Sequence, residues 1–145
     1  MIMNEATRRR HSHTELKEHV GQIRLGAREI PALSPEERRL LVARILDFLH
    51  GMLAPHAMEE ERGLYPVIAS LLGDPRATAT MVRDHQAIRE RVVALERVAP
   101  EDGAALQELL YGLYALISVH LWKEEVEYLS LLAESGSASD ATSWR

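Results

Sequence analysis

An internal repeat of helical segments is the feature that most constrains the fold of this chain. Shifting residues 49–67 by 64 places lays them on residues 113–131, and the apolar positions of the two segments then coincide. Each segment carries the pattern His-x-x-x-Glu, at 56–60 in the first and 120–124 in the second. Each half of the chain therefore reads as one helical hairpin. Two such hairpins predict an all-α fold, an up-down-up-down antiparallel four-helix bundle.

Prolines, glycines and capping residues divide the chain into four expected helices. Ser34 and Glu37 form a capping box around Pro35, and Gly73 is a typical residue at a helix C-terminus. The helices are expected at about 12–30, 34–72, 74–99 and 102–133. These bounds predict one bundle domain at 12–133, with flexible termini at 1–11 and 134–145.

Pro55 interrupts the second expected helix. A proline removes one helical hydrogen bond and collides with the carbonyl four residues earlier. We therefore expect a kink or bulge at 51–55, immediately before His56. The kink is either simply tolerated or it aims the imidazole of His56.

Composition excludes several classes of function. The chain has no cysteine, which excludes disulfides, iron–sulfur clusters and thiolate metal sites. Its net charge of −5 disfavours nucleic acid and anionic membranes as partners. Residues 1–10 contain no apolar stretch typical of a secretory signal, and no window approaches 18 uncharged apolar residues. We therefore expect a cytoplasmic protein with no nucleic-acid or membrane partner.

Two carboxylates are predicted to point into the core. His56 and Glu60 lie one turn apart on the apolar face of their helix, as do His120 and Glu124. No lysine or arginine lies on these faces, and an unpaired buried carboxylate is very costly. Metal ions would supply the missing positive charge. Imidazole and carboxylate ligands without thiolate suit iron, manganese or zinc, and room for two ions suits di-iron or di-manganese.

The ligand on the first helix is either His13 or His19. Both lie about equally far from the apolar face of that helix, on opposite sides. A shift of 72 places lays His13 on His85, so the repeat favours His13. His19 stays as an alternative or additional ligand, and His50 is expected to bind no metal.

Three motifs resemble the hemerythrin-like, His-His-Glu cation-binding family. They are HAMEEERGLYP at 56–66, MVRDH at 81–85 and HLWKEEVEYLSLL at 120–132, and the resemblance spans roughly residues 12–133. It implies a site with two iron ions, manganese or zinc being alternatives. Its implied ligands are His56, Glu60, His85, His120 and Glu124, with the two glutamates bridging the metals and the histidines capping them.

The chain departs from the oxygen-carrying hemerythrins at one ligand position. Those proteins place two histidines one turn apart on the third helix, whereas the neighbours of His85 at that spacing are Met81 and Arg89. Four histidines and two carboxylates would leave open positions on the metals, as catalysis or small-ligand binding requires.

These features lead to two functional hypotheses. The first is a non-enzymatic di-iron protein that binds or senses O₂ or NO, or handles iron. The second is a di-iron enzyme that decomposes hydrogen peroxide or acts as a small oxidase. The expected partner is accordingly a diatomic ligand or peroxide, and the long apolar helices also allow a homodimer.

Other polar residues near the motifs have two readings. The carboxylates at 59, 61 and 125 are either solvated or hydrogen-bonded to a ligand histidine. Tyr65 and Tyr111 are expected to pack in the core. Tyr114 and Tyr128 either do the same or donate a proton to a metal-bound oxygen species.

Overall fold

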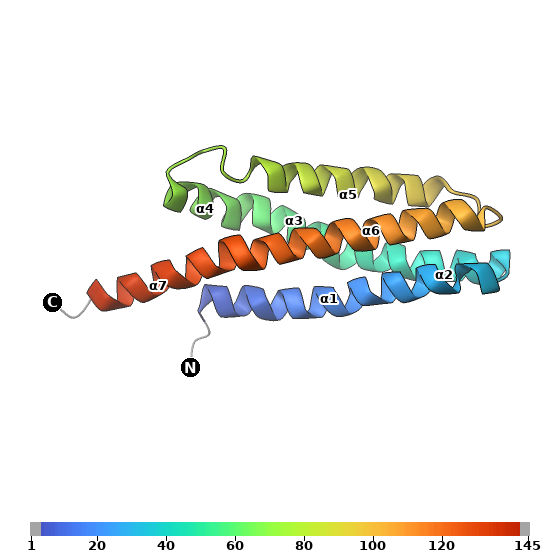
Figure 1. Cartoon of the computed structure of the whole chain (residues 1–145), viewed down its shortest axis with the longest axis horizontal. Helices are drawn as coiled ribbons and strands as arrows, with labels where there is room; N and C mark the ends of the chain where they lie inside the picture. Colours follow the sequence, from blue (N-terminus) through green and yellow to red (C-terminus); the bar gives the residue numbers. More distant parts are fainter. Residues whose placement is uncertain (1–3, 143–145) are drawn as a thin grey trace.

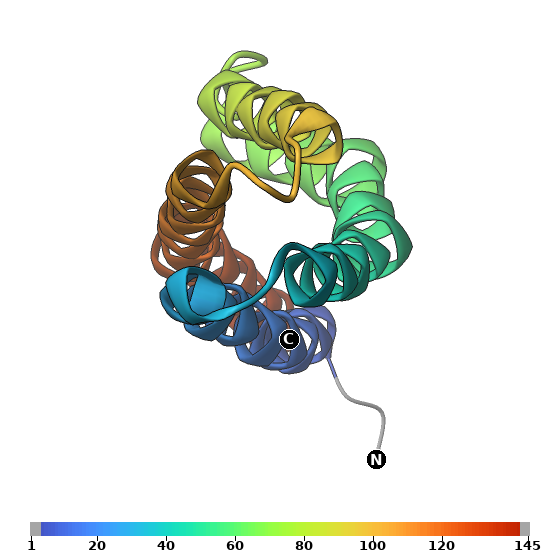
Figure 2. The same cartoon turned by 90° about the vertical axis from the view of Figure 1, so that its right-hand side faces the viewer.

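Helices account for nearly all of the chain that the computed structural model describes, which is the backbone of residues 4–142 and the side chains of residues 4–136. No strand occurs within these residues. Four helical rods lie side by side and surround a common axis (Figures 1 and 2). The prediction of an all-α chain with four long helical segments is confirmed.

The rods are interrupted in different ways. The first consists of α1 (Glu5–Glu29) followed by a short 3₁₀ turn, η1 (Ile30–Ala32). The second contains α2 (Pro35–Phe48), η2 (Leu49–Leu53), α3 (Ala54–Glu59), η3 (Glu60–Leu64) and α4 (Tyr65–Leu72). The third is α5 (Ala79–Arg97), and the fourth contains α6 (Gly103–Lys123), η4 (Glu124–Leu129) and α7 (Ser130–Thr142). The segments η2, η3 and η4 are π-helical turns.

The first helix begins earlier than its predicted start at residue 12. The side chain of Asn4 accepts a hydrogen bond from the Thr7 amide at 2.8 Å and caps a helix that starts at Glu5. Ala6 in this first turn is only 5% exposed and belongs to the buried apolar residues. The predicted flexible termini are thus partly helical, and their flexibility stays a prediction. Residues 1–3 and 143–145 lie outside the described residues.

Local signals in the second rod act as predicted. Ser34 and Glu37 form both hydrogen bonds of the capping box, and Gly73 ends α4 with a left-handed φ of 68°. The bulge expected at 51–55 is confirmed as the π-helical turn Leu49–Leu53. Pro55 then sits in the first turn of α3, where its missing N–H does no harm.

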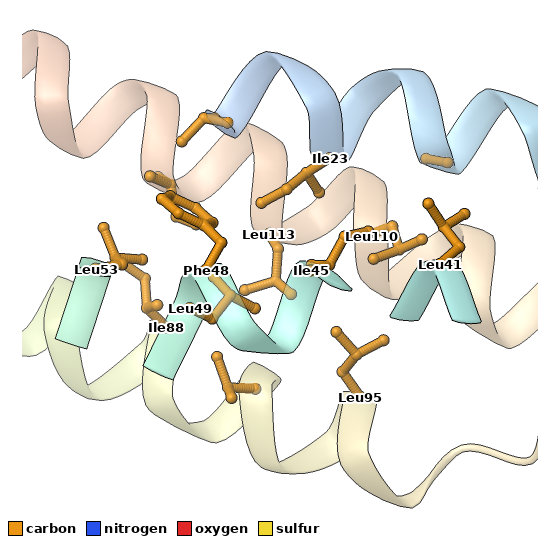
Figure 3. Packing of buried hydrophobic residues seen from close by; sticks show 14 of the residues in the cluster. Ile23, Leu41, Ile45, Phe48, Leu49, Leu53, Ile88, Leu95, Leu110 and Leu113 are labelled. Atoms are coloured by element: carbon orange, nitrogen blue, oxygen red, sulfur yellow. The ribbon is translucent and has the colours of Figure 1, made fainter. Parts of the chain in front are cut away.

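Aliphatic side chains from all four rods fill most of the interior (Figure 3). Leu110, Leu113 and Ile117 of α6 are fully buried against residues of the other rods. A second apolar cluster contains Leu64, Tyr65, Ile68, Met81 and Tyr128. The buried carboxylates among the described residues are those of Glu60 and Glu124. Along the fourth rod, Glu124 follows Leu121 of the first cluster and precedes Tyr128 of the second.

One helical stretch bears on the expectation that no segment crosses a membrane. By length and composition, Gly103–Gly136 could span one, with a mean hydropathy of 1.3 over its most apolar window. The core helix of a bundle meets the same criteria, and 33% of this window is buried inside the protein. It also carries the buried polar residues His120 and Glu124. The stretch is therefore weak evidence for a membrane segment, although it is more apolar than expected.

Candidate metal centre

Six polar side chains from the four rods converge in the interior. They are His13 of α1, His56 of α3, Glu60 of η3, His85 of α5, His120 of α6 and Glu124 of η4. Five of them are at most 3% exposed, and the His56 side chain is 11% exposed. The structure thus brings together six of the seven residues that were predicted as ligands.

The six residues form two overlapping groups. The first group, here position A, is His13 and His56 with both glutamates, and its ligand atoms lie within 4.8 Å of one another. His13 Nε2 lies 3.2 Å from Glu124 Oε2 and 3.9 Å from Glu60 Oε2. His56 Nε2 lies 3.2 Å from Glu60 Oε1. Position A can therefore offer one ion two nitrogens and two carboxylates.

Position B, the second group, contains His85 and His120 with the same two glutamates, again within 4.8 Å. His120 Nε2 lies 2.9 Å from Glu124 Oε1, and His85 Nε2 lies 3.6 Å from Glu60 Oε1. The Nε2 atoms of the two histidines are 3.0 Å apart. The two groups therefore share the carboxylates of Glu60 and Glu124.

Several buried atoms of the cluster have no hydrogen-bond partner within the protein. The unpartnered buried atoms here are Glu60 Oε2, Glu124 Oε2, His13 Nδ1 and His56 Nε2. His56 Nε2 lies near Glu60, but not in hydrogen-bonding geometry. Leaving buried polar atoms unpaired is costly, and two of these atoms are carboxylate oxygens. A divalent cation would satisfy such oxygens, and the imidazole and carboxylate set suits iron, manganese or zinc.

Electrostatic coupling shifts the pKa values of the cluster. Burial alone would lower the pKa of His13, but the nearby carboxylates of Glu124 and Glu60 outweigh it and raise the pKa to about 9. Burial alone would raise the pKa of Glu60, but contacts with His13, His56 and His85 hold it far below its ordinary range. Without metal, the proton on His13 therefore supplies positive charge to the cluster, and despite burial the pKa of His120 is raised as well by its contacts with Glu124 and Asp84.

Protein freed of metal by a chelator is expected to lose stability as the pH rises. Because the pKa of His13 is raised by folding, its protonated ring stabilises the folded state fully at a pH below 6.5, its pKa in the unfolded chain. This stabilisation is lost as the pH rises past about 9. The loss should reach about 3 kcal/mol at most. Urea unfolding at a series of pH values measures it. His13→Gln should reduce the alkaline loss but not abolish it, because the pKa of His120 is also raised, by its contacts with Glu124 and Asp84. The same change at exposed His50 should leave the loss as it is.

An outer layer of polar groups holds the ring atoms that face away from the cluster. His85 Nδ1 lies 2.8 Å from Glu61 Oε1, and His120 Nδ1 lies 3.0 Å from Asp84 Oδ2. His13 Nδ1 lies 3.7 Å from Glu125 Oε1. Carboxylates in such places fix the tautomer and orientation of a ligand imidazole. The contacts therefore favour the second reading for Glu61, whereas His13 Nδ1 makes no hydrogen bond with Glu125.

Both glutamates of the cluster begin a π-helical turn, which the sequence analysis missed. Pro66 follows Glu60 closely and cannot donate to the carbonyl four residues earlier, which favours a wider turn. At the repeat-related place Ser130 donates its hydroxyl to the Glu125 carbonyl at 3.2 Å. Such π-turns are frequent at functional sites. Pro66 is the residue from which the π-helical turn at Glu60 could have been predicted.

Tyr65 is the tyrosine at the cluster, although it was expected only to pack in the core. Its hydroxyl donates to Glu124 Oε1 at 2.5 Å and lies 3.2 Å from His85 Nε2. Burial, together with the charges of Glu60 and Glu124, raises its pKa above the ordinary value, so the hydroxyl stays protonated. Tyr128 instead donates to the carbonyl of Ala77 at 3.3 Å.

Two further histidines lie outside the cluster. His19 is exposed and stacks on Phe48, with ring centroids 4.9 Å apart. This places it away from both positions, so the structure offers His13 and not His19 as the ligand from α1. His50, expected to bind no metal, pairs with Glu96 at the surface at 2.5 Å.

An apolar pocket of about 310 Å³ adjoins the cluster. Its lining residues include Leu53, Ile88 and Ile117, together with His56, Glu60, His85 and His120 of the cluster. The polar groups of the cluster thus border a mostly aliphatic pocket, which is unfavourable for water.

Comparison with known proteins agrees with this geometry. The family model of the hemerythrin HHE cation-binding domain matches residues 7–132. The comparisons with curated proteins and with solved structures gave no match. A match over most of the chain shows the family, and the His and Glu side chains that the fold brings together are of the type that a cation-binding domain requires. The chain belongs to the hemerythrin HHE cation-binding domain family.

Proposed function

We propose that this protein binds two iron ions at positions A and B and uses them to bind or sense O₂ or NO, or to handle iron. The observation that carries the proposal is the pair of histidine groups that share Glu60 and Glu124. The shared carboxylates suit two ions held close together, and the bundle interior is where di-iron proteins of this kind build their sites. Manganese and zinc are the alternative metals.

The proposed scaffold is an antiparallel up-down-up-down bundle of two repeated hairpins. The course of the chain in Figure 1 supports it, because α2 to α4 lead back along α1 and α6 to α7 lead back along α5. The histidines of the two halves then face one another across the axis. We further propose a cytoplasmic protein, with a homodimer as the alternative to a monomer. Its net charge of −5 argues against nucleic acid as a partner.

A diatomic ligand fits the surroundings of the cluster. Each position has two imidazoles and two carboxylates that the positions share, so an ion there keeps places for another ligand. The pocket that His85 and His120 help to line is mostly aliphatic. An apolar diatomic molecule enters such a space without losing hydrogen bonds, whereas peroxide would lose several.

Metal content and ligand binding test the proposal together. Protein produced in iron-rich medium should contain two irons per chain by elemental analysis. When reduced, it should change its visible absorption on adding O₂ or NO, and vacuum should reverse the change. Absence of bound metal, or one loosely held zinc, would contradict the proposal. Two irons without any response to either gas would leave iron handling as the surviving part.

The second candidate function is an enzyme that breaks down hydrogen peroxide or acts as a small oxidase. Tyr65 favours it, because this hydroxyl holds a proton beside Glu124, His85 and His120. Such an enzyme should release O₂ from peroxide faster than an equal amount of free iron, and Tyr65→Phe should slow it. Tyr128→Phe is the matched control, since that hydroxyl bonds to a backbone carbonyl. A rate no better than free iron would exclude the enzyme.

A further inference from the structure

The internal repeat makes the two metal positions comparable residue by residue. The 72-place shift lays His13 on His85, and the 64-place shift lays His56 on His120. Position A and position B are therefore repeat-related. The same shifts identify the outer residue behind each histidine, so the surroundings of the two positions can be compared pair by pair.

The histidines of position B are held firmly from outside. His85 Nδ1 lies 2.8 Å from Glu61, and His120 Nδ1 lies 3.0 Å from Asp84. Lys123 in turn pairs with Asp84 at 2.5 Å. Both rings thus have a carboxylate within hydrogen-bonding distance, and such partners pre-orient a ligand and increase its basicity.

The histidines of position A are held loosely. His13 Nδ1 is 3.7 Å from Glu125, which is beyond a hydrogen bond, and Glu125 pairs with Lys17 at 2.5 Å instead. His56 Nδ1 lies 3.5 Å from the hydroxyl of Ser12. In position A, the only outer contact within 3.5 Å is therefore the long one from His56 to a neutral hydroxyl. In position B, each ring has a short contact to a charged carboxylate.

A break in the repeat explains the weaker support of His56. Ser12 lies 72 places before Asp84, and Glu59 lies 64 places before Lys123. The anion–cation pair behind His120 is thus replaced behind His56 by a hydroxyl and an exposed glutamate. Neither substitute fixes the imidazole or balances charge as the pair does.

Position A contains the most exposed of the four histidines, His56, although its other histidine, His13, is only 1% exposed. The His56 side chain is 11% exposed, whereas those of His85 and His120 are 3% and 4% exposed. A surface pocket of about 260 Å³ borders His56, and Ser12 and Glu59 are among its lining residues. An ion that leaves position A past His56 would therefore meet the oxygen atoms of Ser12 and Glu59.

We infer that the two metal positions are inequivalent: position B binds the first ion and retains it, and position A binds the second ion more weakly and exchanges it through the surface at Ser12, His56 and Glu59. This inference rests on the proposed two-ion site. At limiting metal the chain would accumulate with one ion at position B. The outer partner of a ligand is worth 10- to 100-fold in metal affinity, so the two affinities should differ by about that factor beyond the repulsion of the ions.

Zinc is a suitable probe, because it binds the same ligand types and leaves NMR signals intact. Histidine-labelled protein would be titrated with Zn²⁺ while the imidazole ¹⁵N signals are followed. At one equivalent the signals of His85 and His120 should have moved, and those of His13 and His56 should move only between one and two equivalents. Simultaneous movement of all four, or His13 and His56 moving first, would overturn the inference.

Exchanging residues between the halves tests the cause. Ser12→Asp with Glu59→Lys copies the Asp84 and Lys123 pair and should tighten the second zinc step by about tenfold or more. Asp84→Ser should weaken the first step by a similar factor. Glu59→Lys alone is the control, and it should change the second step far less than the double change. An unaltered second step in the double variant would contradict the assigned cause.

The titration also separates this inference from the proposed function. If the chain binds no zinc, and elemental analysis finds no iron, the two-ion site itself fails. If two ions bind in the wrong order or with equal affinity, only the inequivalence fails. A circular dichroism spectrum of each variant with and without zinc identifies any variant that has simply lost its helices.

Discussion

Replacing Glu124 with glutamine is expected to reduce the bound metal from two ions per chain to one or none. Glutamine keeps the shape of the side chain but removes the charge, and Glu124 belongs to both positions. Even an outer partner of a ligand is worth 10- to 100-fold in affinity, so the loss of a shared ligand should cost about 100-fold or more. Elemental analysis of purified protein and competition with a coloured chelator measure the change.

Glu127→Gln is the control for this prediction. Glu127 lies in the same π-helical turn, but its side chain is exposed and belongs to neither position. The Glu127→Gln variant should therefore keep both ions. A sterner comparison is the double change Glu60→Ala and Glu124→Ala. If that variant is more stable than the parent and binds as much metal, the buried carboxylates bind no ion and the cluster has no metal-binding role.

The second large effect is expected from Leu110→Ala. This substitution should lower the free energy of unfolding of the protein by roughly 2–5 kcal/mol. Leu110 is 0% exposed and packs in the main apolar cluster (Figure 3), so the shorter side chain leaves a cavity that the rods cannot fully close. It precedes His120 by almost three turns of helix. The folded variant should therefore still bind two ions, and urea unfolding of chelator-treated protein measures its stability.

Leu40→Ala is the matched control for Leu110. The same atoms are removed, but Leu40 is 59% exposed, so the change should stay within about 0.5 kcal/mol. Equal effects at the two positions would mean that the interior around Leu110 is not packed as described. Loss of metal from folded Leu110→Ala would mean that the site depends on the core far more directly than the distance along α6 implies.

The repeat was a strong predictor because it combined two independent patterns. Apolar periodicity placed His56 and His120 on faces that must be buried, and the register between the halves paired them. The same register chose His13 over His19, and the structure places His19 at the surface against Phe48. Local rules succeeded in the same way at Ser34 and at the Leu49–Leu53 bulge, since caps and prolines act within one turn.

Features that depend on contacts between rods were not predicted. Tyr65 follows Glu60 by five residues, and a regular α-helix would turn the two away from each other. The π-helical turn η3 instead leaves both residues buried, and the Tyr65 hydroxyl meets Glu124 of the fourth rod. The start of α1 was also missed, because Asn4 and Ala6 gain their roles only once that turn packs against the bundle.

The sequence by itself determined the helical class, the repeat and the residues that supply nitrogen and oxygen to the interior. Hydrophobic periodicity and local capping specify these features without knowledge of the neighbours. The tertiary structure alone decided which histidine faces which glutamate, and which outer residue supports each ring. Asp84 and Ser12 occupy the same place in the repeat, yet only the packed bundle brings one to 3.0 Å from His120 and leaves the other 3.5 Å from His56. A hydrogen bond depends on tenths of an ångström, and those are set by the packing of rods that are distant in the chain.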